Sequence, residues 1–188
     1  MKNVRLFAAL IFFSGTLSIS AVAQGASKAP SKAAASPSQA VLERWNEVGG
    51  KLIAMAEDFP EEKYDFKPAA SVQSFAERLV HSAQAVQIFA DTTLGRKASM
   101  ENEGNHPKSK AEVVAFVKKS FADGASAIQA KGDEGLSSIV VAPFSHEQTR
   151  LGDLAYDFIE HSAEIYGQLT VYYRVAGMVP PASRDKKR

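Results

Sequence analysis

The chain has 188 residues, which is enough for one domain together with a leader and tails. It contains no cysteine, so disulfide bonds, thiolate chemistry and a lipid-modified N-terminal cysteine are excluded. Its 22 basic and 21 acidic residues nearly cancel, and this balance gives no electrostatic argument for a nucleic-acid partner or an anionic membrane surface.

The first 23 residues have the three parts of a secretory signal peptide. Lys2 and Arg5 form a basic start, residues 6–13 are wholly apolar, and residues 21–23 are the small run Ala-Val-Ala. Hydroxyl residues and a glycine interrupt the apolar run after residue 13, which favours cleavage over an uncleaved membrane anchor. We therefore predict cleavage after residue 23, a periplasmic or secreted protein, and no stable membrane anchor once the leader is removed.

A linker and a first helix are predicted next. Residues 24–38 consist mainly of Ala, Ser, Lys, Pro and Gly, and a segment of this composition buries little apolar surface, so we expect a disordered linker. The helix is expected from about residue 38 to 58, before a Phe-Pro pair. Its apolar seam repeats at alternating intervals of three and four: Leu42, Trp45, Gly49, Leu52, Ala56 and Phe59. Glycine in this seam weakens the helix but allows another helix to approach closely.

The second predicted helix runs from Ser74 to about Thr93. Ser74 and Glu77 have the spacing of a capping box, and Gly95 provides a stop. Residues 95–108 are rich in Gly, Asn, Glu and Lys, which predicts a polar loop. When extended, this loop would reach about 45 Å, more than the length of about 30 Å expected for a helix of this size. The topology therefore need not be a simple up-down-up-down arrangement.

The third predicted helix begins after Ser109, which forms another capping box with Glu112, and closes at Gly132. Its apolar seam contains Val114, Val117, Phe121, Ala125 and Ile128. Residues 138–141 read Ser-Ile-Val-Val and predict a short extended piece before the last helix.

The fourth predicted helix covers residues 151–175, with Thr149 as its cap and Gly177 with a following Pro-Pro pair as its end. One stripe of this helix, at spacings of three and four, contains Leu151, Leu154, Phe158, His161, Ile165, Gln168 and Tyr172. The stripe places a histidine, His161, inside the bundle.

These elements predict an all-α fold, a four-helix bundle over residues 39–183. No alternating pattern is long enough for a sheet, and the chain has no internal repeat. Residues 184–188 form a basic tail that we expect to be solvated. The chain has no glycine-rich phosphate loop, no HExxH motif and no nucleophile elbow, so the reactions that those motifs serve find no support.

The four histidines differ in their expected surroundings. His106 and His146 fall in polar loops and are expected to be solvated. His81 lies in the second helix, away from its main apolar face and nearer Ala85, so periodicity alone does not place it in the core. His161 is the histidine that its own helix places on an apolar seam.

Two carboxylates accompany His161 at helical spacing. Asp157 lies one turn before it and Glu164 almost one turn after it, so either could orient the imidazole or share a metal with it. A core histidine is the commoner interpretation of such a position. Two histidines and a carboxylate can nevertheless hold a divalent transition metal and leave positions open for water or substrate.

Several segments together resemble the DinB-like (DinB/YfiT) superfamily, and its exported bacterial members in particular. They are Trp45, residues 56–68, residues 74–81, and residues 166–174 with the Gly and Pro-Pro that follow. The resemblance covers residues 40–183. It implies an up-down-down-up four-helix bundle with a long crossover loop between helices 2 and 3.

The resemblance also implies a divalent metal, such as zinc or nickel, held by three histidines. The ligand from helix 2 corresponds to His81, and the first of two from helix 4 corresponds to His161. The third corresponds to position 165, which is isoleucine here. Isoleucine has no lone pair, so the three-histidine site of the family cannot form unless Glu164 or Asp157 replaces the missing ligand.

Three functions stay open at this point. The first is an exported, metal-dependent protein of transferase or hydrolase type with a degraded site, because the family includes thiol S-transferases and proteins taken to be hydrolases. The second is a non-catalytic bundle without metal, in which Ile165 packs the former ligand position and the protein binds an unknown small molecule or forms a homodimer. The third is an envelope interaction protein that uses its tyrosines and loops. The sequence does not decide whether the protein is an enzyme.

Overall fold

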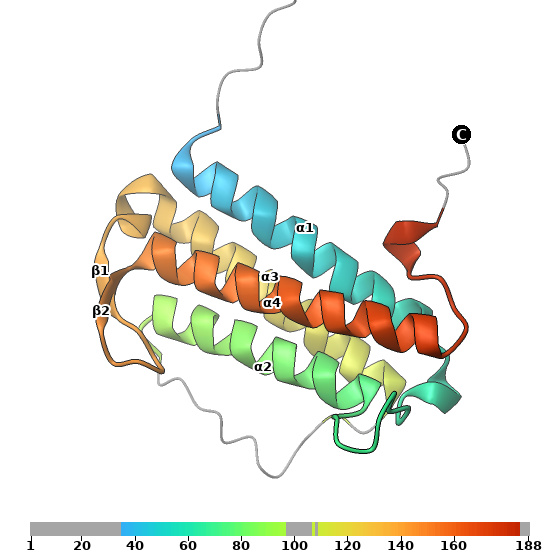
Figure 1. The fold of residues 1–188 in the computed structure, drawn as a ribbon. Coiled ribbons are helices and arrows are strands. Elements are labelled where there is room, and N and C mark those ends of the chain that lie inside the picture. The colour runs from blue at the N-terminus through green and yellow to red at the C-terminus, as the bar shows by residue number, and fades with distance from the viewer. Residues whose placement is uncertain (1–34, 97–106, 108, 185–188) are drawn as a thin grey trace, which may run out of the picture. The chain divides into compact units, whose positions relative to one another are not determined.

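The computed structural model describes residues 35–96, 107 and 109–184 (Figure 1). The predicted signal peptide, most of the predicted linker and loop, His106, and residues 185–188 lie outside the described residues.

Four helices form the described part of the chain: α1 (Pro37–Asp58), α2 (Phe75–Thr93), α3 (Lys110–Leu136) and α4 (Leu151–Val175). α1 and α2 each pack against both α3 and α4, so α1 lies diagonally across the bundle from α2. α1 and α4 run in one direction, and α2 and α3 run in the other (Figure 1). The predicted up-down-down-up bundle is therefore confirmed.

The shorter elements lie at the ends of the helices. A 3₁₀ turn, η1 (Glu61–Lys63), follows α1, and another, η2 (Pro181–Ser183), follows α4. Strands β1 (Ile139–Val141) and β2 (Gln148–Arg150) form an antiparallel hairpin between α3 and α4. None of the described helices has the length and apolar character needed to cross a membrane.

Two predicted capping boxes are confirmed at the starts of α2 and α3. The Ser74 hydroxyl accepts a hydrogen bond from the Glu77 amide, and the Glu77 carboxylate accepts one from the Ser74 amide. Ser109 and Glu112 form the same pair of bonds. Each box satisfies amide groups that would otherwise lack a partner within the helix.

α1 starts at Pro37, one residue before the predicted start. Ser36 is its N-cap and forms a further capping box with Gln39, so residues 37 and 38, expected at the end of the linker, are helical. The Ser36 hydroxyl and the Ser38 amide also donate hydrogen bonds to Asp133 Oδ1, at 3.0 Å and 2.8 Å. The first turn of α1 is thereby attached to the far end of α3.

The boundaries between α3 and α4 correct two predictions. Gly132 has a positive φ of 59° and breaks the regular helix, as expected, but helical structure resumes and extends to Leu136. The predicted cap Thr149 is instead paired with Val140 in the hairpin. Arg150 is the N-cap of α4 and makes no side-chain capping bond. Hairpin pairing therefore replaces the predicted cap.

The centre of the bundle is organised around Trp45 of α1. Its side chain is only 1% exposed, and its indole N–H donates to the Phe121 carbonyl at 3.0 Å. The ring lies 4.8 Å from that of Phe89 in α2, measured between centroids. A Cβ at Gly124 of α3 would lie 2.0 Å from the indole, and one at Gly49 of α1 would lie 2.6 Å from the Phe121 ring. The two glycines therefore allow the close approach of α1 and α3.

A polar cluster fastens the other end of α1 to the C-terminal segment. The buried Tyr173 hydroxyl donates to the Met55 carbonyl at 3.0 Å and to the Asp58 carboxylate at 3.2 Å. Arg184 donates two hydrogen bonds to that carboxylate, at 2.8 Å and 2.5 Å. The bond from Arg184 holds the pKa of Asp58 below its usual range, although desolvation acts in the opposite direction. Arg184, predicted to lie in a solvated tail, is thus part of a specific ion pair.

Replacing Gly124 by alanine tests the close packing of α1 on α3. The added methyl group would meet a rigid indole, so we expect Gly124→Ala to lower the free energy of unfolding by about 1–3 kcal/mol, despite the better helix propensity of alanine. Gly50→Ala is the matched control, because a Cβ at Gly50 meets nothing within 4 Å. This control should raise stability by about 0.5–1 kcal/mol. Urea denaturation followed by circular dichroism measures both, and an unchanged or more stable Gly124→Ala variant would contradict the packing.

Candidate functional site

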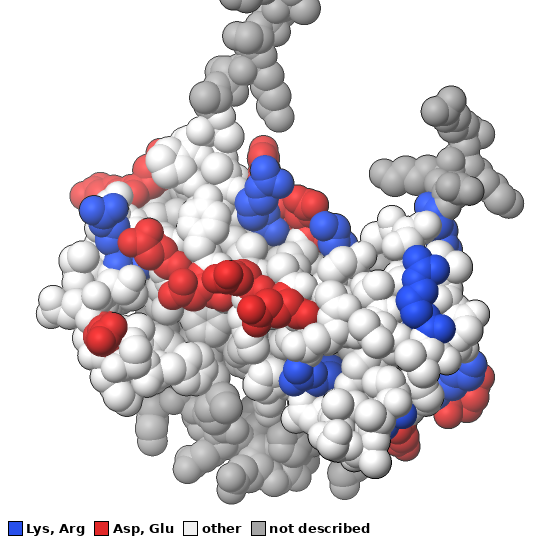
Figure 2. Space-filling view, in the orientation of Figure 1, with Lys and Arg blue, Asp and Glu red and all other residues white. Residues whose placement is uncertain are grey.

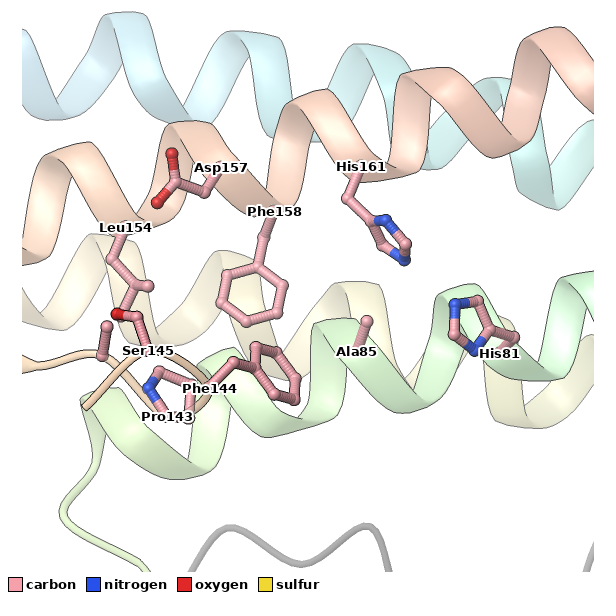
Figure 3. Close-up of a pocket in the computed structure, with 10 residues that line it drawn as sticks. His81, Ala85, Pro143, Phe144, Ser145, Leu154, Asp157, Phe158 and His161 are labelled. Atoms are coloured by element: carbon pink, nitrogen blue, oxygen red, sulfur yellow. The ribbon is translucent and has the colours of Figure 1, made fainter. Parts of the chain in front are cut away.

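Two histidines from different helices meet between α2 and α4. His81 comes from the middle of α2 and His161 from the middle of α4, and their ring centroids lie 5.2 Å apart (Figure 3). The planes of the two rings are inclined by 72°, so that the edge of one imidazole faces the other. The structure therefore brings together the two histidines that the family resemblance selected.

The position of His81 follows from the double packing of α2. Because α2 contacts both α3 and α4, it needs apolar side chains on more than one face. Leu79 and Val86 are buried on its main apolar face, and Ala85 and Ile88, nearer His81, are buried as well. His81 itself is partly buried. The helical wheel correctly placed His81 near Ala85, away from the main apolar face. It could not show that a second helix covers this side of α2.

Burial changes the acid–base properties of His81. Desolvation is the largest cause that lowers its pKa, followed by the neighbouring His161 and by the positive charge of Arg78. Desolvation and a nearby cation both disfavour the protonated imidazole. At neutral pH this ring therefore keeps a nitrogen lone pair with which to accept a hydrogen bond.

The histidine pair lies at one end of a pocket of about 410 Å³. α2, α4 and the loop between β1 and β2 surround it (Figure 3). Besides the two histidines, its lining consists of Ala85, Ala142, Pro143, Phe144, Ser145, Leu154, Asp157 and Phe158. Most of this lining is apolar, and the polar side chains are few. The pocket thus combines an apolar body with a small number of hydrogen-bonding groups.

Phe144 is a pocket residue that the sequence reasoning missed. It belongs to the loop between β1 and β2, so no helical or strand period indicates where its side chain lies. The side chain is 59% exposed, and its ring centroid lies 6.2 Å from that of Phe158. The sequence did show a large apolar residue just after the segment predicted to be extended, which could have indicated a binding residue. It did not show that the loop turns toward α2.

The two carboxylates that were predicted to assist a metal occupy different places. Both are exposed, but Asp157 lines the pocket and Glu164 does not. Ile165 is only 1% exposed and belongs to the hydrophobic core. Within the described ranges, no three His, Cys, Asp or Glu side chains come together as a metal site would require. The donor set present therefore does not fit the three-histidine metal site that the family resemblance implies.

A second cavity of about 580 Å³ lies on the other side of His81. Arg78, which lines it, donates hydrogen bonds to Gln73, at 3.0 Å, and to Gln168. Gln168 was expected on the buried stripe of α4, but it is exposed and its neighbour Leu169 is buried instead. The guanidinium of Arg78 is therefore held in the second cavity and is not among the residues that line the first. His146 is exposed, as expected.

Comparison with known proteins identifies the family. The model of the DinB superfamily matches residues 44–169, a range that includes both paired histidines and Ile165. The chain belongs to the DinB superfamily. Its fold is similar to that of a DinB-like protein from Bacillus cereus, with a TM-score of 0.64 and 19% identity over 75% of this chain and 93% of the other. A DinB-like protein from Bacillus subtilis gives a TM-score of 0.59 and 20% identity over 74% and 93%. No curated protein matches the chain.

Ile165→His tests whether position 165 corresponds to the missing ligand position. A third imidazole beside the pair should tighten zinc binding at least tenfold, equivalent to about 1.4 kcal/mol. It should also lower the free energy of unfolding by about 2 kcal/mol, because a polar ring replaces a buried aliphatic side chain. Isothermal titration calorimetry of tag-free protein with zinc measures the affinity.

Glu164→His is the matched control for that experiment. It adds the same imidazole one residue away, on an exposed position of α4. We expect it to leave zinc affinity within about twofold of the unmodified protein, because its side chain points to solvent. If Ile165→His folds but binds zinc no better than this control does, position 165 does not face the histidine pair.

Proposed function

We propose that this member of the DinB superfamily binds a small molecule in the pocket between α2, α4 and the β1–β2 loop. The ligand has an apolar body and at least one hydrogen-bonding group. The observation that carries the proposal is an apolar pocket of about 410 Å³ with two imidazoles at one end. Pockets of roughly 300–1,000 Å³ with mainly apolar walls and a few placed polar groups are typical of small-molecule sites.

The apolar part of the ligand would contact two aromatic rings. Phe158 is held in the core by α4, whereas Phe144 projects from the loop and is largely exposed. A ligand that covers Phe144 removes apolar surface from water, which contributes roughly 25 cal/mol for each Å². A bound ligand would therefore explain why the apolar ring of Phe144 is exposed.

The polar part of the ligand would meet the histidine pair. Each neutral imidazole offers one donor nitrogen and one acceptor nitrogen. Two such rings on facing helices can hold a ligand oxygen or nitrogen in a defined direction, because α2 and α4 fix both backbones. This pair would select a ligand with a polar group at one end.

Ile165 favours this function over the metal-dependent chemistry that the family resemblance implies. With isoleucine at the third position, the described residues supply two histidines instead of three, and we therefore do not propose a metal-dependent transferase or hydrolase reaction. A weak zinc or nickel site made by His81 and His161 is the second candidate, and the imidazole pair is the observation that favours it. One equivalent of metal retained by tag-free protein through dialysis would support this second candidate.

Filling the pocket should weaken ligand binding. We expect Ala142→Phe and Ala85→Phe to weaken binding of 2-phenylethanol, an aromatic probe with one hydroxyl, at least about tenfold, because the added ring takes its place. Protein-observed NMR titration measures the affinity. Ala163→Phe is the matched control, since Ala163 lies on the exposed side of α4, outside the pocket lining. Two Ala→Phe variants allow for one that folds poorly. Equal binding by all three variants would place the probe elsewhere and contradict the proposal.

We also propose that the protein is exported and that residues 1–23 are its leader. The support is the order of a basic start, an apolar stretch and a small-residue run in the sequence. Expression of the full chain in a bacterium should therefore yield a mature protein that begins at Gln24. Intact-mass measurement of the periplasmic fraction tests this expectation. A chain that keeps its first 23 residues and stays in the membrane fraction would refute it.

A further inference from the structure

We propose that the ligand of this pocket is an organic cation, an amine with an aromatic or aliphatic body, whose ammonium group pairs with Asp157 while its body lies against Phe144 and Phe158. This inference rests on the proposed function and adds the charge of the ligand. It follows from which charged side chains line the pocket, which do not, and which of them already have partners.

Asp157 is the charged side chain of the pocket lining, and it lacks an ion-pair partner within the described ranges. Along α4 it lies one turn before His161, with Phe158 between the two (Figure 3). A ligand that lies over Phe158 would therefore have a carboxylate near one end and the imidazole pair near the other. The carboxylate end accepts hydrogen bonds and attracts positive charge.

The carboxylate of Asp157 is one of a row. Asp153, Asp157, Glu160 and Glu164 succeed one another at intervals of four, three and four residues, so they share one face of α4. All four are exposed, and none forms an ion pair with another described residue. Figure 2 shows acidic side chains following one another over α4. Like charges one turn apart repel each other, and their summed field attracts cations to the pocket beside them.

The aromatic walls favour the same ligand. Cations are attracted to the faces of aromatic rings within about 6 Å, and Phe144 and Phe158 provide two rings in the lining. Such a contact needs no dedicated charge on the protein. The attraction of the rings adds to that of Asp157. The same rings can also pack against the apolar body of the ligand when its ammonium group lies at Asp157.

An anionic ligand finds no comparable partner in this pocket. Its lining contains neither lysine nor arginine. The neighbouring cation, Arg78, lines the other cavity, beyond His81, and already donates to Gln73 and Gln168. A carboxylate ligand would therefore lie beside Asp157 without a compensating charge, which is unfavourable.

Three probes with the same phenyl body separate these possibilities: 2-phenylethylammonium, 2-phenylethanol and 3-phenylpropionate. We expect the ammonium to bind at least about fivefold more tightly than the alcohol, and the carboxylate to bind most weakly. Protein-observed NMR titration of the full folded domain at one fixed salt concentration measures all three. Asp157→Asn should reduce the preference for the ammonium to less than about twofold. Asp153→Asn, the same change one turn away and outside the lining, should leave most of that preference in place.

Each outcome bears on one of the two proposals. If the three probes bind with equal affinity, or if the carboxylate binds most tightly, the cation inference is overturned and the pocket remains a ligand site. The same holds if Asp153→Asn and Asp157→Asn have equal effects, because the contact with Asp157 would then be absent. If none of the probes perturbs the resonances of pocket residues, the proposed function fails together with the inference.

Discussion

The fit of Trp45 against Gly124 is the constraint on which the arrangement of the helices depends. An indole is large and rigid, and it packs against α3 because residue 124 has no side chain. The same ring extends across the bundle to Phe89 of α2, which lies diagonally opposite α1. Its N–H donates to the carbonyl of Phe121, so the one polar group of the indole is satisfied although the ring is buried.

The site depends on this central packing without sharing residues with it. α2 packs against α3 and, through Phe89, against Trp45 of α1. Another face of α2 packs against α4. That contact is what brings His81 and His161 within 5.2 Å of each other. The rigid centre determines the separation of the helices, and the hairpin loop, which is packed less tightly, closes the pocket from one side. Sites of this design combine fixed polar groups with an adaptable apolar wall.

The sequence was sufficient for the helices, because their signals are local. The capping boxes at Ser74 and Ser109 and the seam through Trp45 depend on residues within a few positions of each other. The predictions failed where a distant partner decides. Thr149 pairs across a hairpin instead of capping α4, and Arg184 bonds to Asp58, which lies 126 residues away. Phe144 lines the pocket only because its loop folds back. For His81, the pairing with His161 came from family resemblance, since its own helix gave no sign of it.

Ile165 occupies the position that the family resemblance assigns to a third histidine, and it packs in the core of the bundle. An isoleucine at this position adds buried apolar surface to the core, whereas a histidine there would need a metal or a hydrogen-bonding partner. Isoleucine at this position therefore favours a stable apolar core. The pocket beside His81 and His161 is lined by residues of α2, α4 and the hairpin loop, and Ile165 is not one of them.

The attachment of Ser36 and Ser38 to Asp133 has a consequence for the order in which the chain folds. These contacts span 97 and 95 residues, so the first turn of α1 is synthesised long before its partner. At a synthesis rate of about 5–20 residues per second, the interval is roughly 5–20 s. During that time the indole of Trp45 also lacks its position on α3. The first turn of α1 therefore waits for its partner while roughly half of the chain is synthesised.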